Sequence, residues 1–353
     1  MRGCLFLYIT YTMKFTPISE IGTKKLQAKL STFIGSNTLL ESDNYTIESL
    51  RSKFSTNHRL IQHSLTFVEG VHFDITYTPF EHLGYKAISL LSNDFYAQMG
   101  QIISIGCHLS IPNRVSVEMI ESLVAGLNQG CVDNGCALVE KNVQSNAQRI
   151  IINIYGLGVT EIPSKKVKDQ VSEGDAICLS GDVGAAIAGL RILMREKKYW
   201  QEQGEGNFQP DLGDYSYVVQ RQLMPKSRKD LVELFEKEHI SPTTVRHLNG
   251  GVLNEVASLC EDCGLGAHIY QATLPIAVET RQVADEMEED VDKYAYFGGE
   301  DSELLFTLPE VEADRLFKLF KDFTVIGRMT DSKSSLVIQT AEGDILSYDD
   351  MRV

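Results

Sequence analysis

Positive charge and long apolar runs are the two features this sequence is short of. Its 33 Lys and Arg face 48 Asp and Glu, giving a formal net charge of -15. Such an excess of negative charge repels phosphate backbones and anionic lipid surfaces. The apolar stretch at residues 4–9 is too short to span a bilayer, and no other segment approaches that length. We therefore expect no nucleic acid and no membrane as a partner, and a cytoplasmic protein.

Cysteines are few and odd in number, which argues against a disulfide framework. The seven of them are spread along a chain large enough to build a core without crosslinks. Cys260 and Cys263 form a Cys-x-x-Cys pair, but no second pair or histidine cluster at zinc spacing accompanies it. We expect two small side chains near a helix end, with a metal or redox role as the alternative.

The length of the chain predicts two domains. Its 353 residues are about twice a typical domain, and 43% hydrophobic with 23% charged residues is an ordinary globular composition. The proposed boundary lies near residue 160, giving domains at residues 1–160 and 161–353. Residues 1–14 are interpreted as a disordered segment or a misassigned start, with Met13 as the alternative initiator.

Alternating helical and strand patterns predict an α/β or α+β fold. Apolar periodicity indicates helices at residues 18–33 and 117–130, and strands at 102–109 and 149–155, the last ending at Gly156. Residues 60–72 and 86–91 fit either a strand or a buried helix. In the second half we expect a strand at 176–179, helices at 185–196 and 250–260, and a loop at 202–215.

A glycine turn at residues 180–184 (Ser-Gly-Asp-Val-Gly) joins the strand at 176–179 to the helix that follows. Strand, glycine turn and helix in that order bring backbone N–H groups to a helix N-terminus, where a phosphate can bind. This spacing occurs in many proteins. It makes Gly181 and Gly184 weak candidates for a nucleotide or phosphate loop.

Several separated motifs resemble thiamine monophosphate kinase, of the aminoimidazole ribonucleotide (AIR) synthase superfamily. They are Val-Glu-Gly-Val-His-Phe at 68–73, Leu-Gly-Tyr-Lys-Ala at 83–87 with Asp94 beyond it, and Gly-Gly-Glu-Asp at 298–301 followed by Glu-Leu-Leu-Phe at 303–306. The resemblance covers residues 15–330. The first motif also favours the thiamine branch over the purine-synthesis ligases.

The resemblance implies a two-domain AIR synthase-like fold. It implies a homodimer in which the N-terminal domains pair their sheets into a barrel, with a C-terminal α/β domain alongside. In such enzymes ATP lies in a cleft and aspartates hold Mg²⁺ ions beside it, because transfer between two phosphorylated anions needs cations. His72, Glu300 and Asp301 are the implied substrate contacts. Lys86 and Arg221 fit either phosphate contacts or solvated surface charges.

This sequence departs from the family where the metal ligands are expected. Only Asp94 remains of the aligned carboxylates. Non-acidic residues occupy six aspartate positions: Ser36, Asn37, Leu65, Asn142, His247 and Gly250. A shared magnesium cluster depends on hard oxygen ligands, and His247 suits a transition metal only if partners accompany it. If the alignment is right, these positions gather in one cavity around Asp94.

Two hypotheses follow. The first is a degenerate homodimer that keeps the fold, has lost Mg-ATP chemistry, and binds a small phosphorylated ligand or a protein partner without a firm cofactor. The second is a working ATP-dependent kinase that makes thiamine diphosphate, with Mg²⁺ held by Asp94 and by carboxylates outside the alignment, such as Asp182, Glu140 or Asp301. The six replacements favour the first.

Overall fold

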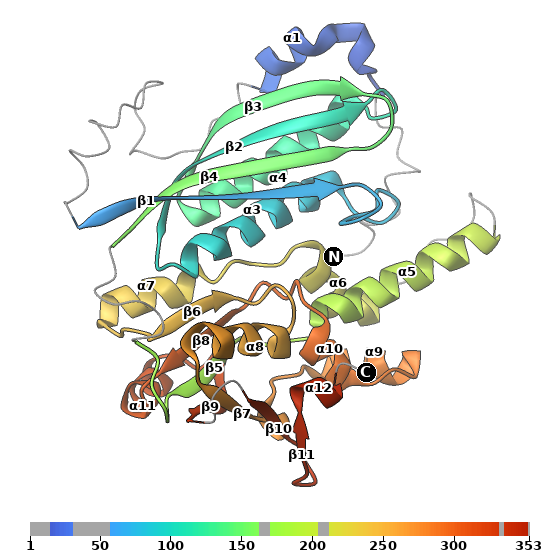
Figure 1. The fold of residues 1–353 in the computed structure, drawn as a ribbon. Helices are drawn as coiled ribbons and strands as arrows, with labels where there is room; N and C mark the ends of the chain where they lie inside the picture. Colours follow the sequence, from blue (N-terminus) through green and yellow to red (C-terminus); the bar gives the residue numbers. More distant parts are fainter. Residues whose placement is uncertain (1–14, 31–56, 162–169, 204–211, 332–334, 352–353) are drawn as a thin grey trace.

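The computed structural model describes residues 15–30, 57–161, 170–203, 212–331 and 335–351 (Figure 1). The described residues of its N-terminal half form one sheet and three helices. The strands are β1 (His58–Val68), β2 (Gln101–Pro112), β3 (Ala137–Asn146) and β4 (Ile151–Glu161), and the helices are α1 (Ile18–Leu30), α3 (Phe80–Tyr96) and α4 (Val117–Asn134). The strand order is β1-β4-β2-β3, with only β2 and β3 parallel.

Helices α3 and α4 lie between this sheet and the C-terminal half, so α3 contacts both (Figure 1). The two helices cross closely because glycines stand at the crossing. A side-chain carbon on Gly84 would lie 2.2 Å from the carbonyl oxygen of Leu123, and one on Gly126 would lie 1.8 Å from that of Glu81. No larger residue fits at either position without moving a helix.

The C-terminal half is a seven-stranded sheet with helices packed on it (Figure 1). Its strand order is β11-β10-β7-β9-β5-β8-β6. The strands are β5 (Ala176–Ser180), β6 (Thr244–His247), β7 (Gly266–Tyr270), β8 (Leu304–Leu308), β9 (Phe323–Thr330), β10 (Leu336–Gln339) and β11 (Ile345–Ser347). The helices are α5 (Ala185–Gln203), α6 (Ser216–Leu223), α7 (Lys229–Glu238), α8 (Val252–Cys263), α9 (Val278–Met287), α10 (Val291–Phe297), α11 (Glu310–Leu319) and α12 (Tyr348–Met351).

The hydrophobic core is continuous between the two halves. One cluster of buried side chains contains Leu91 of α3 together with Phe306 of β8 and Phe235 of α7. A second cluster lies within the C-terminal half, around Val252 and Leu305. The halves are therefore joined by packing as well as by the polar contacts described below.

The mixed α/β fold class is confirmed, and most expected elements form. The expected end of the strand at Gly156 is wrong, because β4 continues to Glu161. Glycine is needed there since the Phe95 ring packs against the strand: a side-chain carbon on Gly156 or Gly158 would lie 2.8 or 2.7 Å from that ring. Residues 86–91 belong to α3, which begins after Pro79.

The Cys-x-x-Cys pair lies in the last turn of α8, which ends at Gly264 in a left-handed conformation. Both thiols are free, as are the other four cysteines in the described part of the chain. The expectation of small side chains at a helix end is confirmed.

Among the described residues, none of the helices is both long and apolar enough to cross a membrane. The start-site alternatives, the replaced positions Ser36 and Asn37, and much of the loop at 202–215 lie outside the described residues.

Candidate functional site

A cavity of about 710 Å³, here called the interdomain cavity, lies between the two halves of the chain. From the N-terminal half it is lined by the loop after β1 and by α3, and from the C-terminal half by α5, the end of α6 and the segments around residues 250 and 299. His72, Glu300, Gly250 and Lys86 all line it. The structure thus brings together two of the implied substrate contacts, one lost aspartate position and one candidate phosphate contact.

His72 stands at the cavity in an exposed loop whose hydrogen bonds fix its ring. The backbone N–H of Val68 donates to its Nδ1 at 3.1 Å, and its own N–H donates to the carbonyl of Val68 at 3.0 Å. Because Nδ1 accepts, the neutral ring carries its proton on Nε2. His72 can therefore donate one hydrogen bond to a ligand from Nε2.

Lys86 and Glu300 form an ion pair across the two halves. The Nζ of Lys86 lies 2.7 Å from Oε2 of Glu300, and the lysine side chain is only 5% exposed. The motif that carries Glu300 is tightly folded: Gly299 has φ +71, and a side-chain carbon there would lie 2.3 Å from the carbonyl oxygen of Asn249. The interpretation of Lys86 as a solvated surface charge is wrong, because its side chain is buried where the two halves meet and is paired there with Glu300. We call this region of contact between the halves the joint.

Asp301 points away from this cavity and into the protein. It is 1% exposed, and its two oxygens accept the backbone N–H groups of Gly184 and Ala186, each at 2.9 Å. Burial raises its pKa to about 6, although Arg221 and those two N–H groups act in the opposite direction. The carboxylate caps the N-terminus of α5. Its assignment as a substrate contact stays a prediction, with both oxygens already bonded.

The backbone N–H groups of the glycine turn before α5 are also already hydrogen-bonded within the protein. The N–H of Gly181 donates to the carbonyl of Asp322, that of Val183 to Pro275, and that of Gly184 to Asp301. A phosphate at this turn would have to displace the Asp301 carboxylate from Gly184. The backbone N–H groups of Gly181, Val183 and Gly184 thus all have acceptors already. The assignment of this turn as a phosphate loop stays a prediction.

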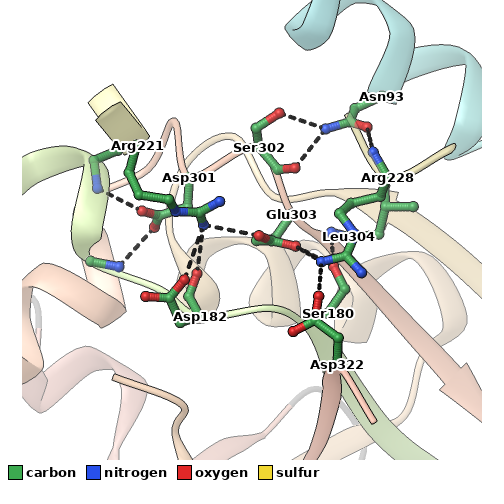
Figure 2. Close-up of polar contacts among 12 residues, drawn as sticks. Asn93, Ser180, Asp182, Arg221, Arg228, Asp301, Ser302, Glu303, Leu304 and Asp322 are labelled. Carbon is green, nitrogen blue, oxygen red and sulfur yellow. Dashed lines mark hydrogen bonds and ion pairs between the residues drawn. The ribbon is translucent and has the colours of Figure 1, made fainter. Parts of the chain in front are cut away.

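Glu303 is the centre of a buried ionic network that sequence reasoning missed (Figure 2). Its carboxylate lies 2.9 Å from Arg221 and 3.0 Å from Arg228, and it accepts a hydrogen bond of 2.6 Å from the Ser180 hydroxyl. Burial raises its pKa to about 7, even though the two arginines lower it. Arg221, whose side chain is 16% exposed, is thus held in this network by carboxylates, so its interpretation as a solvated charge is also wrong.

This network borders a second cavity of about 730 Å³, lined by Gly181, Asp182, Arg221 and Arg228 among others. Arg228 also lies 2.7 Å from Asp322 and 3.0 Å from Asp230. Each arginine in this wall therefore already has at least two carboxylate partners. The motif at residues 303–306 contained the signal for the network, since it places an acidic residue directly before a buried apolar run.

Asp94, the carboxylate expected to ligate a metal, is paired with His247, one of the six predicted replacements. The Nδ1 of His247 lies 2.8 Å from Oδ1 of Asp94, joining β6 to α3. The histidine side chain is 6% exposed, and within the described part of the chain its Nε2 has no hydrogen-bond partner. Asp94 therefore has an imidazole as neighbour, at a position where the resemblance implies a second carboxylate.

The other replaced positions do not gather around Asp94. Leu65 lies on β1 and Asn142 on β3, which are opposite edges of the four-stranded sheet. Leu65 packs partly against the main core cluster. Gly250 lines the interdomain cavity, and Ser36 and Asn37 lie outside the described residues. The expectation of one cavity around Asp94 is wrong for Leu65, Asn142 and Gly250; His247 contacts Asp94, but neither of these two residues lines the cavity that contains Gly250.

Magnesium does not fit the described residues as they stand. They contain no group of three or more histidine, cysteine or acidic side chains arranged to hold a metal ion. The carboxylates named as alternatives are engaged: Asp182 with Arg221, Asp301 with backbone N–H groups, and Glu140 with the hydroxyl of Tyr155. Mg²⁺ needs near-octahedral oxygen ligation, which these separate pairs do not provide.

Comparisons with known proteins agree with this architecture. The family models for the N-terminal and C-terminal domains of AIR synthase related protein match residues 42–160 and 172–339. The chain is 29% identical to the thiamine-monophosphate kinase of Aquifex aeolicus over 269 residues, which are 76% of this chain and 81% of the relative.

Solved structures lead to the same fold. AaThiL complexed with AMPPCP and TMP superimposes with a TM-score of 0.69 at 25% identity, covering 96% of this chain and 99% of that one. The hydrogenase maturation protein HypE of E. coli superimposes with a TM-score of 0.70, covering 92% and 96%, but at 18% identity it bears on the fold alone. The chain therefore belongs to the AIR synthase-related family, and its resemblance to thiamine-monophosphate kinase is confirmed.

Proposed function

We propose that this chain binds a small ligand in the interdomain cavity and has lost the Mg-ATP phosphoryl transfer of its kinase relatives. The observation that carries the proposal is the contact between Asp94 and His247. Where a kinase of this family would gather carboxylates around magnesium, this chain has one carboxylate and an imidazole. An imidazole is a poor ligand for Mg²⁺, which prefers oxygen.

The charges of the cavity wall support the same proposal. Lys86 is neutralised by Glu300, Asp74 is paired with Lys197, and Glu255 lies 4.0 Å from Arg246. Phosphoryl transfer between two anions requires cations that are free to hold both phosphates. Since these cations are already paired, the cavity suits a ligand that carries less charge than a nucleoside triphosphate.

Calorimetry and a product assay test the proposal together. We expect no magnesium-dependent binding of ATP, and no thiamine diphosphate above a no-enzyme control when the protein is incubated with ATP, Mg²⁺ and thiamine monophosphate. The Aquifex aeolicus relative, assayed in parallel, validates the conditions. Tight Mg-dependent ATP binding, or product formation, would overturn the loss of chemistry.

The second candidate is an active thiamine-monophosphate kinase. It is favoured by the relatives of that name, because this chain matches 81% and 83% of the length of two of them. It requires metal ligands beyond the pairs described above. The same product assay decides between the two, since only the kinase converts thiamine monophosphate to the diphosphate.

We also propose a homodimer that pairs through the open face of the N-terminal sheet. On β1, Ile61 is buried beneath the helices while the preceding Leu60, which points to the opposite face, is 50% exposed. Val139 on β3 is 43% exposed. Sedimentation velocity should give a dimer, and Leu60→Glu should shift it towards monomer.

The cytoplasm remains our predicted location, consistent with six free thiols among the described cysteines.

A further inference from the structure

The interdomain cavity reaches solvent between the loop after β1 and helix α5. Val71 of the loop and Met194 of α5 both line the cavity, and they are 68% and 50% exposed. Figure 1 shows α5 extending away from the C-terminal sheet and alongside this loop. The separation of these two segments therefore governs access to the cavity.

Two contacts hold the loop against α5. Tyr77 is 8% exposed and packs in one cluster with Ala185 and Ala188, near the start of the helix. Further along the helix, the Nζ of Lys197 forms an ion pair with Asp74, and both side chains are more than two-thirds buried. Of the ion pairs made by the described residues, this is the one that connects α5 to the N-terminal half.

Asp74 also shapes the loop itself. Its Oδ1 accepts the backbone N–H of Thr76 at 2.8 Å, and its carbonyl accepts that of Thr78 at 3.0 Å. Burial alone would raise the pKa of Asp74, but hydrogen bonds from Lys197 and Thr76 outweigh that effect and leave the pKa lowered. The carboxylate is therefore charged at neutral pH, and the loop conformation is coupled to the position of α5.

We propose that the Asp74–Lys197 ion pair is a clasp that holds the loop against α5 and limits the rate at which small molecules enter the cavity. Tyr77 stays packed against the first turns of α5, so the loop and the helix move about this contact when the ion pair opens. When the ion pair opens, the loop and the distal part of α5 separate while the remaining interdomain contacts stay in place. This device does not depend on the identity of the ligand, so it can fail or hold independently of the proposed function.

The test measures entry with a reagent that needs no binding site. Leu223 lines the cavity and is 3% exposed, so a cysteine placed there by Leu223→Cys reacts with N-ethylmaleimide when the loop and α5 move further apart. Peptide mass spectrometry counts the label at residue 223 separately from the native cysteines. Adding Lys197→Met should raise the labelling rate at least tenfold. Salt should accelerate labelling in the parent but not in this variant, because the charge pair is gone.

The chain offers a matched control on the same helix. Lys198 is 75% exposed and pairs only loosely with Glu202, at 4.0 Å, so Lys198→Met removes the same charge without touching the clasp. It should leave the labelling rate unchanged. Asp74→Asn provides a second break of the clasp that keeps an oxygen acceptor for Thr76, and it should accelerate labelling as Lys197→Met does.

Cys178 reports whether the whole domain opens instead. It is fully buried in β5, so its labelling in the same samples measures global unfolding. The proposal is overturned if Lys197→Met and Asp74→Asn label at the parental rate. It is equally overturned if Lys198→Met accelerates labelling as much, or if Cys178 labels in step with residue 223.

Discussion

Asp94 and His247, which are 153 residues apart in the chain, meet at 2.8 Å in the joint between the two halves. The aspartate comes from α3 and the histidine from the end of β6. Asp94 is the metal ligand that the resemblance implies, and His247 occupies one of the positions where it implies a lost aspartate, so two of the implied positions lie together. This contact also indicates how a metal response could be restored.

His247→Asp should create a magnesium-responsive site. Two carboxylates at this distance repel each other, so the variant is expected to unfold at a lower temperature than the parent without metal. Millimolar Mg²⁺ should then recover roughly 1 kcal/mol, or about 2–4 °C in the unfolding midpoint. His247→Asn, which adds no charge, should lose stability without responding to Mg²⁺. A variant indifferent to Mg²⁺ would show that the two positions cannot share a metal.

Glu303 should make stability fall as pH rises through neutrality. Its folded pKa of about 7 lies above the value of 4.5 for an unperturbed glutamate, so the folded protein binds more protons than the unfolded chain between these values. Glu303→Gln should flatten that slope, measured by urea unfolding from about pH 5 to pH 7. Glu310→Gln, at an exposed position, should keep the parental slope.

Asp301→Ala should destabilise the protein by about 2 kcal/mol, at the upper end for helix caps, because two buried N–H groups lose their acceptor. Asp290 provides the matched comparison: it caps α10 by accepting the N–H of Asp292 at 3.0 Å, but it is exposed. Asp290→Ala should cost at most about 1 kcal/mol. Equal losses in chemical denaturation would contradict a buried capping role for Asp301.

Gly299→Ala should damage the joint more than Gly174→Ala. Both glycines have positive φ, +71 and +88, so a side chain strains each backbone by about 1–2 kcal/mol. At Gly174 nothing lies within 4 Å of the added carbon, whereas at Gly299 it would meet the carbonyl oxygen of Asn249 at 2.3 Å. The free energy of unfolding should therefore drop further for Gly299→Ala. Similar losses would mean that the Asn249 segment can move aside.

The sequence predicted elements well where one pattern dominated and poorly where packing decided. The β-branched residues of the predicted strand at 149–155 indicated β4, but its continuation through Gly156 and Gly158 depends on the Phe95 ring, which comes from another element. Residues 86–91 fitted a strand or a helix equally because they are buried on nearly all sides. Neither outcome can be read from local periodicity.

The same limit applies to the candidate site. The motifs singled out His72, Glu300 and Lys86, and the structure places all three at one cavity. The network around Glu303 was missed since its partners are 75, 82 and 123 residues distant in the chain. Asp301 was assigned to a ligand because its role as a cap depends on where α5 begins in space.

The close crossing of α3 and α4 has a consequence for the joint between the halves. Lys86, Asn93 and Asp94 are spaced at i, i+7 and i+8, so they lie on one side of α3, and each contacts the C-terminal half. Gly84 and Gly126 fix how α3 is rotated about its own axis. Two glycines that touch no ligand thus set the angular alignment of every polar contact that α3 makes across the joint, and a methyl group at either one would misalign all three together.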